Sequence, residues 1–319
     1  MQTATTRGAA LVTRRADARR PALTVAMPSA APSAPSSASP RKRATVLLVL
    51  PALVLLLPFL AAVLFILRYS VSAESQAISG WSLAHYGALF EPFFLRSVLL
   101  TLKLATVSTL ICMALAVPIA MLMAALAQPV WRRVITSLVL LPMILNLLIQ
   151  SYGWMMVLGP TGVANTVLMQ AGVIDHPLSL LFNEVGVLVG LVQTALPLAV
   201  FPVLGAMRVI SQEYLEAAGS MGATPWRSFF DVTLPLLKPG LISAASIVFA
   251  YNASAFAVPL LLGGRKVQMM GVAIRDMISP MFDWGGAAAA GVALILITLV
   301  TMMLATWLAT RAVQLKEAR

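Results

Sequence analysis

Six long apolar stretches constrain the fold of this 319-residue chain more than any other feature of its sequence. A helix needs about 20 apolar residues to cross the hydrocarbon core of a bilayer, and each stretch reaches that length. Every backbone N–H and C=O inside hydrocarbon needs an internal partner, so stretches rich in Leu, Ala, Met and Val predict helices. The predicted fold class is all-α, a polytopic membrane bundle of six transmembrane helices. The predicted spans are 44–67, 98–126, 134–158, 185–207, 240–262 and 285–310.

The composition excludes an ordinary soluble enzyme. Hydrophobic residues make up 60% of the chain and charged residues 10%, whereas a soluble domain carries roughly 25% charged residues. Such a chain has too few polar side chains to cover its cores in water, so lipid must serve as part of its solvent. Cys112 is the one cysteine, which excludes an internal disulfide. We interpret it as a small hydrophobic core residue.

The first 43 residues differ from the rest of the chain. They hold eight of the 22 Lys and Arg residues, are rich in Ser, Pro and Ala, and contain no aromatic residue. This composition predicts a disordered, basic cytoplasmic tail. The pairs Arg14-Arg15 and Arg19-Arg20 also allow a targeting signal or a contact with anionic lipids. Met27 offers an alternative start, which leaves open whether the residues before it are made.

The positions of the cations predict the orientation in the membrane. If both termini lie in the cytoplasm, the cytoplasmic segments hold sixteen Lys and Arg residues and the outer segments hold five, as the positive-inside rule requires. The C-terminal tail, 312–319, is then cytoplasmic. The stretch 44–67 is longer than the 7–15 apolar residues of a signal peptide, so we interpret it as a retained first helix.

The longest predicted cytoplasmic loop, 208–239, is polar and carries several helix-end signals. Ser211 is a plausible N-cap for a first short helix, and Gly222 can adopt the left-handed conformation that ends one. Thr224 and Pro225 then have the chemistry of a second N-cap and first turn. The loop therefore predicts two short helices joined at a glycine, on the inner surface of the membrane.

Two interpretations of this pair of helices are open. It is either an amphipathic hairpin that lies in the lipid surface or a docking element for another protein. The small residues Ala217 and Ala218 allow close approach of a partner backbone, and the carboxylates of Glu213 and Glu216 are repelled by anionic lipids. These features favour docking to a protein.

The same loop carries a family resemblance. Glu216-Ala217-Ala218, then Gly222, Val232 and Leu234-Pro235, resemble the EAA loop of inner-membrane permeases of binding-protein-dependent ABC importers, in which Ile is usual at the position of Val232. The order of spans from about 97 to 311 resembles the same family, with 44–67 as an extra first helix. The ATPase-coupling residues that the resemblance implies are Glu213, Glu216, Ala217, Ala218, Gly222, Leu234 and Pro235.

The resemblance also implies partners and a mechanism. Such a permease works with a cytoplasmic ABC ATPase dimer, a second permease subunit that is either a copy or a different chain, and an external or periplasmic solute-binding protein. It moves a small solute across the bacterial inner membrane by alternating access, as a two-state equilibrium that nucleotide-bound partners bias. Glu216 is expected to pair with a basic group on the ATPase, and no cofactor is implied.

Three further segments resemble the spermidine/putrescine type of permease. They are Tyr152-Gly153-Trp154, then 158–162 with Asn165, and 259–264. Gln150 stands where an Arg is expected in that subgroup. The resemblance therefore implies a polyamine-like solute or another small polar organic solute.

Polar residues inside the predicted spans are candidates for the translocation path, because lipid-facing positions are apolar. Lys103 is alternatively a side chain that reaches the membrane surface, and the others are alternatively partners in helix–helix hydrogen bonds. Acidic residues near the predicted outer face, Glu184, Asp175, Asp276 and Asp283, are candidates for attracting a cation. The path candidates are Lys103, Asn146, Gln150, Gln193, Tyr251, Asn252 and Ser254.

Other function classes fit the sequence less well. A membrane-embedded enzyme has only His85 and His176 available, and the chain contains no His-Glu-x-x-His metal motif and no Gly-x-Ser-x-Gly nucleophile motif. It also lacks a phosphate-binding loop, so any use of ATP needs a separate ATPase. A secondary transporter or channel without an ATPase stays open as the alternative, but its usual signature of broken helices and internal repeats is not visible in the sequence, and it has no use for a cytoplasmic docking loop. We therefore expect a permease and no enzyme, metal site or nucleic-acid partner.

Overall fold

The computed structural model describes residues 40–317, and all regular secondary structure within that range is helical. The all-α prediction is therefore confirmed. Most of the predicted tail, 1–43, lies outside the described residues, as do 318–319. The chain divides into two units, Met1–Leu57 and Pro58–Arg319. Helix α1 (Pro40–Ser70) crosses this division, and its segment Leu53–Ser70 is apolar enough to span a membrane.

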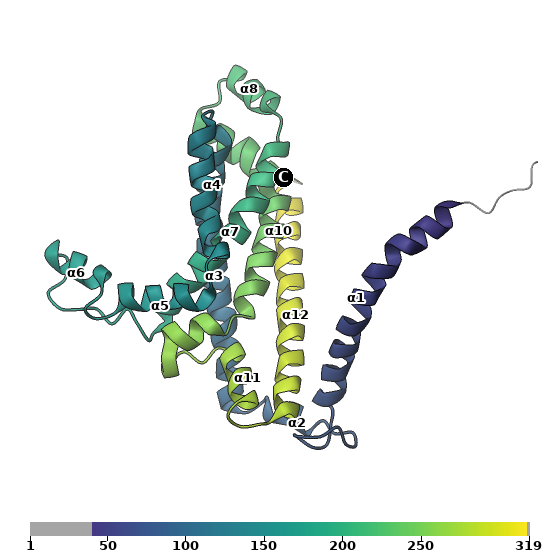
Figure 1. Ribbon diagram of the computed structural model, residues 1–319. Helices are drawn as coiled ribbons and strands as arrows, with labels where there is room; N and C mark the ends of the chain where they lie inside the picture. The colour runs from purple at the N-terminus through teal and green to yellow at the C-terminus, as the bar shows by residue number, and fades with distance from the viewer. Residues whose placement is uncertain (1–39, 318–319) are drawn as a thin grey trace, which may run out of the picture. The chain divides into compact units, whose positions relative to one another are not determined.

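The second unit is built around three helices that pack on one another (Figure 1). They are α3 (Pro92–Ala125), α7 (Glu184–Val209) and α10 (Leu234–Ala253). Their shared core contains small buried residues, among them Ala116, Ala199 and Ala244, which let the backbones approach closely. Helix α12 (Trp284–Glu317) packs against α10, and α4 (Pro129–Ile144) against α7.

The closest approach between two of these helices is at Gly240 in α10. A Cβ atom at Gly240 would lie 2.3 Å from the Cβ of Ala206 in α7, which is closer than two carbon atoms can pack. Glycine is therefore required at this crossing. Only the Ala206 methyl group lies between the two helices there.

The shorter helices lie at the ends and on one side of the bundle. Helix α8 (Gln212–Ser220) lies at one end, and α2 (Ala84–Ala88) and α11 (Met270–Ile278) lie at the opposite end (Figure 1). Helices α5 (Leu147–Leu158) and α6 (Val163–Gln170) extend sideways from the bundle. The end of α3 and the start of α4 lie at the same end of the bundle as α8.

Two predicted spans are wrong as unbroken helices. The span 134–158 is divided into α4 and α5, and the two halves are bent by 103°. The span 240–262 is divided as well: α10 ends at Ala253, and helical structure resumes at 257 and ends in the π-helix η2 (Pro259–Gly263). The other four predicted spans each lie within one helix, apart from a single residue at the end of α3. They are 44–67 in α1, 98–126 in α3, 185–207 in α7 and 285–310 in α12.

Candidate coupling and translocation sites

Helix α8 begins and ends as the sequence predicts. The Ser211 hydroxyl oxygen accepts a hydrogen bond from the backbone N–H of Glu213 at 3.3 Å, which makes Ser211 the N-cap. Gly222 has a φ of +81°, in the left-handed region that glycine favours. The chain reverses there, and the N–H of Ala223 donates to the carbonyl of Ala218 at 3.0 Å.

Nearly the whole surface of α8 is exposed. Glu213, Glu216 and Ala217 are exposed, whereas Ala218 is 3% exposed and lies on the side that faces its own chain. Ala217 is therefore accessible to a partner, whereas Ala218 is buried in its own chain. Tyr214 and Leu215 add exposed apolar surface between the two carboxylates. An exposed face with both apolar and acidic groups has the chemistry of a protein-docking surface.

The second predicted short helix is not separate from the bundle, which corrects the prediction. Helix α9 (Pro225–Ser228), which Thr224 caps, leads through the π-helix η1 (Phe229–Thr233) into α10 without a break. The candidate span therefore runs over Pro225–Ala253, and Leu234 and Pro235 form the first turn of α10. Pro225 and Pro235 do not end the helix because each lies where a first turn begins. As a result, α8 connects directly to α7 on one side and to the α10 span on the other.

A cavity of about 760 Å³ lies beside α8. It is formed by the ends of α3 and α7 together with α8 and η1. Glu216 lines this cavity with Arg132 and Arg208, and Gln212 and Thr233 add polar groups. Glu216 thus has basic groups of its own chain nearby as well as access to solvent.

The break between α4 and α5 is stabilised by two amide side chains. The side-chain amide oxygen of Asn146 accepts a hydrogen bond from the backbone N–H of Leu148 at 2.9 Å and so caps α5. The Gln150 amide donates to the carbonyls of Pro142 and Leu145, which α4 leaves without helical partners at its end. Gln150 is 8% exposed, so its role in the described residues is to hold the elbow between the helices.

The break after α10 is made by a short turn. Ser254 donates its hydroxyl to the carbonyl of Tyr251 at 3.0 Å, and the N–H of Ala255 donates to the carbonyl of Asn252. The Asn252 side chain is fully buried, and its amide donates to the Ser108 hydroxyl in α3 at 2.9 Å. Asn252 therefore ties α10 to α3, whereas Tyr251 and Ser254 remain exposed.

Both breaks meet at one cavity of about 180 Å³. Its lining combines Leu147 at the start of α5, Thr194 of α7, Tyr251 and Ser254 at the end of α10, and the segment 255–258. None of these lining residues is Lys, Arg, Asp or Glu. Discontinuous helices that meet within a bundle are typical of solute sites in membrane transporters. The structure thus brings together two of the predicted path residues, Tyr251 and Ser254, with the polar Thr194 and with Phe256, which the sequence does not mark as a path residue.

The remaining path candidates lie elsewhere. The Lys103 ammonium is 2.6 Å from the Glu184 carboxylate at the start of α7, and the two side chains are 59% and 42% exposed. The indole N–H of Trp154 donates to the Gln193 amide oxygen at 3.4 Å. Lys103 and Gln193 therefore connect helices, and neither lines the cavity at the breaks.

The predicted outer carboxylates also have structural partners. Asp276 pairs with Arg275 at 2.8 Å, and Asp283 accepts from the N–H of Gly286 at the start of α12. Among the described residues, His, Cys, Asp and Glu side chains form no group of three that would hold a metal ion. Asp276 thus pairs with its neighbour in α11, and Asp283 binds the first turn of α12.

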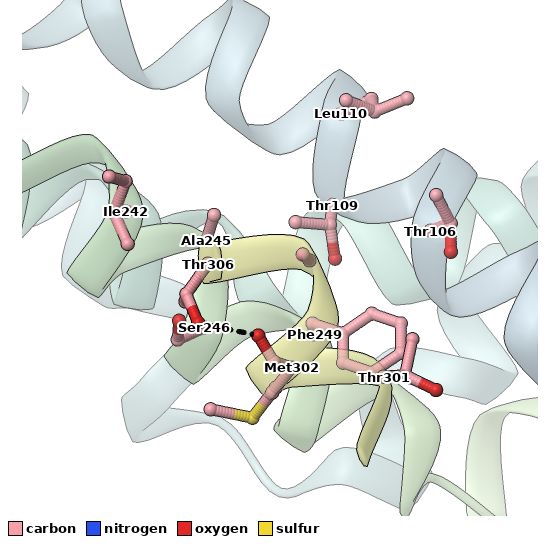
Figure 2. Close-up of a pocket in the computed structure, with 11 residues that line it drawn as sticks. Thr106, Thr109, Leu110, Ile242, Ala245, Ser246, Phe249, Thr301, Met302 and Thr306 are labelled. Carbon is pink, nitrogen blue, oxygen red and sulfur yellow. Dashed lines mark hydrogen bonds between the residues drawn. The ribbon is translucent and has the colours of Figure 1, made fainter. Parts of the chain in front are cut away.

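A second cavity within the bundle is apolar. It has a volume of about 220 Å³ and lies between α3, α10 and α12 (Figure 2). The hydroxyls of Thr109 and Thr306 donate to carbonyls one turn earlier in their own helices, those of Ala105 and Met302. The two threonine side chains therefore offer no free hydroxyl hydrogen, and this cavity has few polar groups for a solute.

Comparison with known proteins identifies the family. Residues 116–314, more than half of the chain, match the family described as the binding-protein-dependent transport system inner membrane component. The chain belongs to this family. It is accordingly a transport permease of a family of inner-membrane components and not an enzyme, and the predicted class is confirmed.

The relatives of this permease include spermidine/putrescine and molybdenum permeases. It is 33% identical to the spermidine/putrescine transport system permease protein PotB of Haemophilus influenzae over 221 residues, which are 69% of this chain and 77% of that protein. It is 31% identical to PotB of Escherichia coli over 236 residues, 74% of this chain and 85% of that protein. The molybdenum transport system permease protein ModB of Azotobacter vinelandii is 31% identical over 59% of this chain and 82% of that protein. The resemblance to the spermidine/putrescine type is therefore confirmed.

Solved structures support the fold of the permease. A bacterial ABC transporter that imports the acidic polysaccharide alginate matches with a TM-score of 0.72 at 20% identity, over 85% of this chain and 96% of that chain. The MetNI methionine ABC transporter matches with a TM-score of 0.51 at 20% identity, over 70% of this chain and 97% of that chain. At these identities the likeness concerns the fold.

Proposed function

We propose that this permease subunit imports a small cationic solute of the polyamine kind, driven by a separate ATPase that docks on α8. The observation that carries the proposal is the exposed face of α8, whose two ends lead directly into α7 and the α10 span. A movement of α8 is therefore transmitted to two packed helices at once. The permease forms no covalent bond with its solute and alternates between two accessible states.

The proposed orientation places both termini and α8 in the cytoplasm. Arg132, Arg133 and Arg208 then lie on the side that the positive-inside rule favours. The basic tail 1–43 and the segment 312–319 flank a transmembrane domain over 44–311. The family is described as the inner membrane component of a binding-protein-dependent transport system, and a second permease subunit, an ATPase dimer and an external solute-binding protein complete the proposed importer.

Within the proposed coupling element, the residues have different roles. Glu213 and Glu216 offer carboxylates to a basic surface of the ATPase, and the exposed Ala217 allows its close approach. Ala218 and Gly222 hold α8 against its own chain and set its turn. Leu234 and Pro235 begin the α10 span, so their role is to carry the movement onward.

The cavity at the breaks is lined by no charged residue of either sign. An isolated buried charge is costly whatever its sign, so the proposal of a cationic solute rests on the relatives, several of which are named spermidine/putrescine permeases. Asn146, Tyr251 and Ser254 are polar residues at or beside the cavity, and we assign them to the path.

Replacement of single residues on α8 tests the docking proposal. The complete importer is purified with Glu216→Arg or Gly222→Ala in this subunit, and the amount of ATPase retained is measured together with solute uptake. Both variants are expected to lose ATPase and uptake. Asp231→Asn is the matched control, because Asp231 is an exposed carboxylate that pairs with Arg227 in the same segment. Full ATPase retention by both variants would refute docking on α8.

Uptake by the reconstituted importer tests the solute. Labelled putrescine, spermidine, methionine and molybdate are offered separately, with the cognate solute-binding protein present. We expect uptake of a polyamine and stimulation of ATP hydrolysis by it. Uptake of molybdate without uptake of either polyamine would contradict the proposed solute class and leave the coupling proposal standing.

A further inference from the structure

The elbow between α4 and α5 lies at a depth where lipid cannot solvate an open backbone. Arg132 and Arg133 in the first turn of α4 mark one membrane boundary, since paired arginines avoid hydrocarbon. Leu145 follows Arg133 by twelve residues, so the elbow lies about 18 Å from that boundary, within a core about 30 Å thick. Leu145 and Asn146 are nevertheless exposed. Non-helical backbone at this depth must face protein or a water-filled cavity.

The cavity beside this elbow presents aromatic rings. Tyr251 and Phe256 both line it, and they are 39% and 50% exposed. The hydroxyls of Thr194 and Ser254 already donate to backbone carbonyls within α7 and α10. Their oxygens can still accept, so these two oxygens and the rings of Tyr251 and Phe256 are the groups that can contact a cationic solute. Ring faces attract cations through their quadrupole and do not attract anions.

Helix ends of both signs lie near the cavity, because α5 and the helical segment from 257 begin where α4 and α10 end. Helices α4 and α10 both end at the breaks, and the C-terminal end of a helix carries a partial negative charge of about half an elementary charge. Such ends of broken helices coordinate cations in other transporters. The opposing N-terminal end of α5 is capped by the Asn146 side chain, which satisfies one of its donors.

We propose that the cavity at the two breaks is one half of a solute site that binds an ammonium group against the rings of Tyr251 and Phe256. This inference rests on the proposed import of a cationic solute and names the residues that recognise it. The cavity is open and small, so the rest of the solute contacts the facing permease subunit. The apolar cavity of Figure 2 is a separate site, because its lining shares no residue with the cavity at the breaks.

Uptake kinetics of the complete reconstituted importer test this site with labelled spermidine as the probe. Tyr251→Leu and Phe256→Leu are each expected to raise KM about tenfold, from the strength of a desolvated cation–π contact. Tyr251→Phe keeps the ring and is expected to retain the parental KM. Phe93→Leu is the matched control, because Phe93 is also 50% exposed and lies outside the cavity. A parental KM in both leucine variants, or an equal loss in Tyr251→Phe, would overturn the inference.

Thiol labelling provides a measurement that does not depend on uptake. Tyr251→Cys in the complete importer is treated with a trimethylammonium thiol reagent and with a sulfonate thiol reagent, while the native Cys112 is fully buried. We expect faster reaction with the cationic reagent and slowing by spermidine. Ile295→Cys, at an exposed position of α12, is expected to show no such preference.

The two measurements separate failure of the site from failure of the proposed solute. A parental importer that hydrolyses ATP but takes up no spermidine refutes the solute, and the labelling preference at Tyr251→Cys then still decides whether the cavity favours cations. Equal labelling rates, or faster reaction with the sulfonate, would refute the site even where spermidine is imported.

Discussion

Replacement of Gln150 by Leu tests whether this side chain holds the elbow between α4 and α5. The change keeps the size of the side chain and removes two hydrogen bonds, those to the carbonyls of Pro142 and Leu145. A side-chain hydrogen bond within a membrane protein contributes about 0.6 kcal/mol on average and up to about 1.7. The loss is therefore expected to be about 1–3 kcal/mol. The side-chain amide oxygen of Gln150 is buried without a partner among the described residues. Because leucine also removes this unsatisfied group, the loss is expected in the lower part of that range.

Thermal unfolding of the subunit in a lipid nanodisc measures this loss. A change of 1 kcal/mol shifts the Tm of a domain of this size by about 2–4 °C, so Gln150→Leu is expected to lower Tm by about 2–12 °C. Gln193→Leu is the matched control, because the same substitution there removes one long hydrogen bond of 3.4 Å from Trp154. The control is expected to shift Tm by less than half as much. An unchanged or higher Tm for Gln150→Leu would refute the bracing role.

Three further predictions follow from individual contacts. At Gly222 an added Cβ would meet open space, but the backbone is in the left-handed region, so Gly222→Ala is expected to cause about 1–2 kcal/mol of local strain. We expect reduced ATP-driven uptake in proteoliposomes and little change in the Tm of the bundle. Gly240→Leu forces a side chain against Ala206 and is expected to destabilise by about 1–3 kcal/mol or more, seen as a lower Tm; Gly205→Leu, at an open position, is its control. A double-mutant cycle of Lys103→Met and Glu184→Gln is expected to give a coupling free energy below about 1 kcal/mol, because both side chains are substantially exposed; a value of several kcal/mol would show that the pair is dry in the membrane.

The sequence predicts the elements whose signal is uniform along the chain. The stretches within α3, α7 and α12 are apolar over more than 20 residues, and length alone identifies them. The ends of α8 are predicted because Ser211 and Gly222 act locally, through one hydrogen bond and one backbone conformation. Membership of the permease family is likewise predicted from the spacing of the EAA loop.

The two breaks are not predicted because an apolar stretch hides them. Asn146 and Ser254 each stand alone among apolar residues, so the average over a span remains high. The signal that indicates the first break is an Asn four residues after Pro142, an N-cap residue in mid-span. The choice between lining and bonding roles for Gln150 and Asn252 depends on tertiary contacts, which no local pattern reveals. The orientation in the membrane and the coupling roles on α8 remain predictions.

The contact between Gly240 and Ala206 is a point about which the helix Pro225–Ala253 can tilt against α7. Fifteen residues separate Pro225 from Gly240, and eleven separate Gly240 from Tyr251, which correspond to arms of about 22 Å and 16 Å. With only the Ala206 methyl at this pivot, a tilt that displaces Pro225 by 3 Å is expected to displace Tyr251 by about 2 Å. If the ATPase docks on α8 and the solute binds at Tyr251 as proposed, we expect a displacement of that size to open or close a contact with an ammonium group.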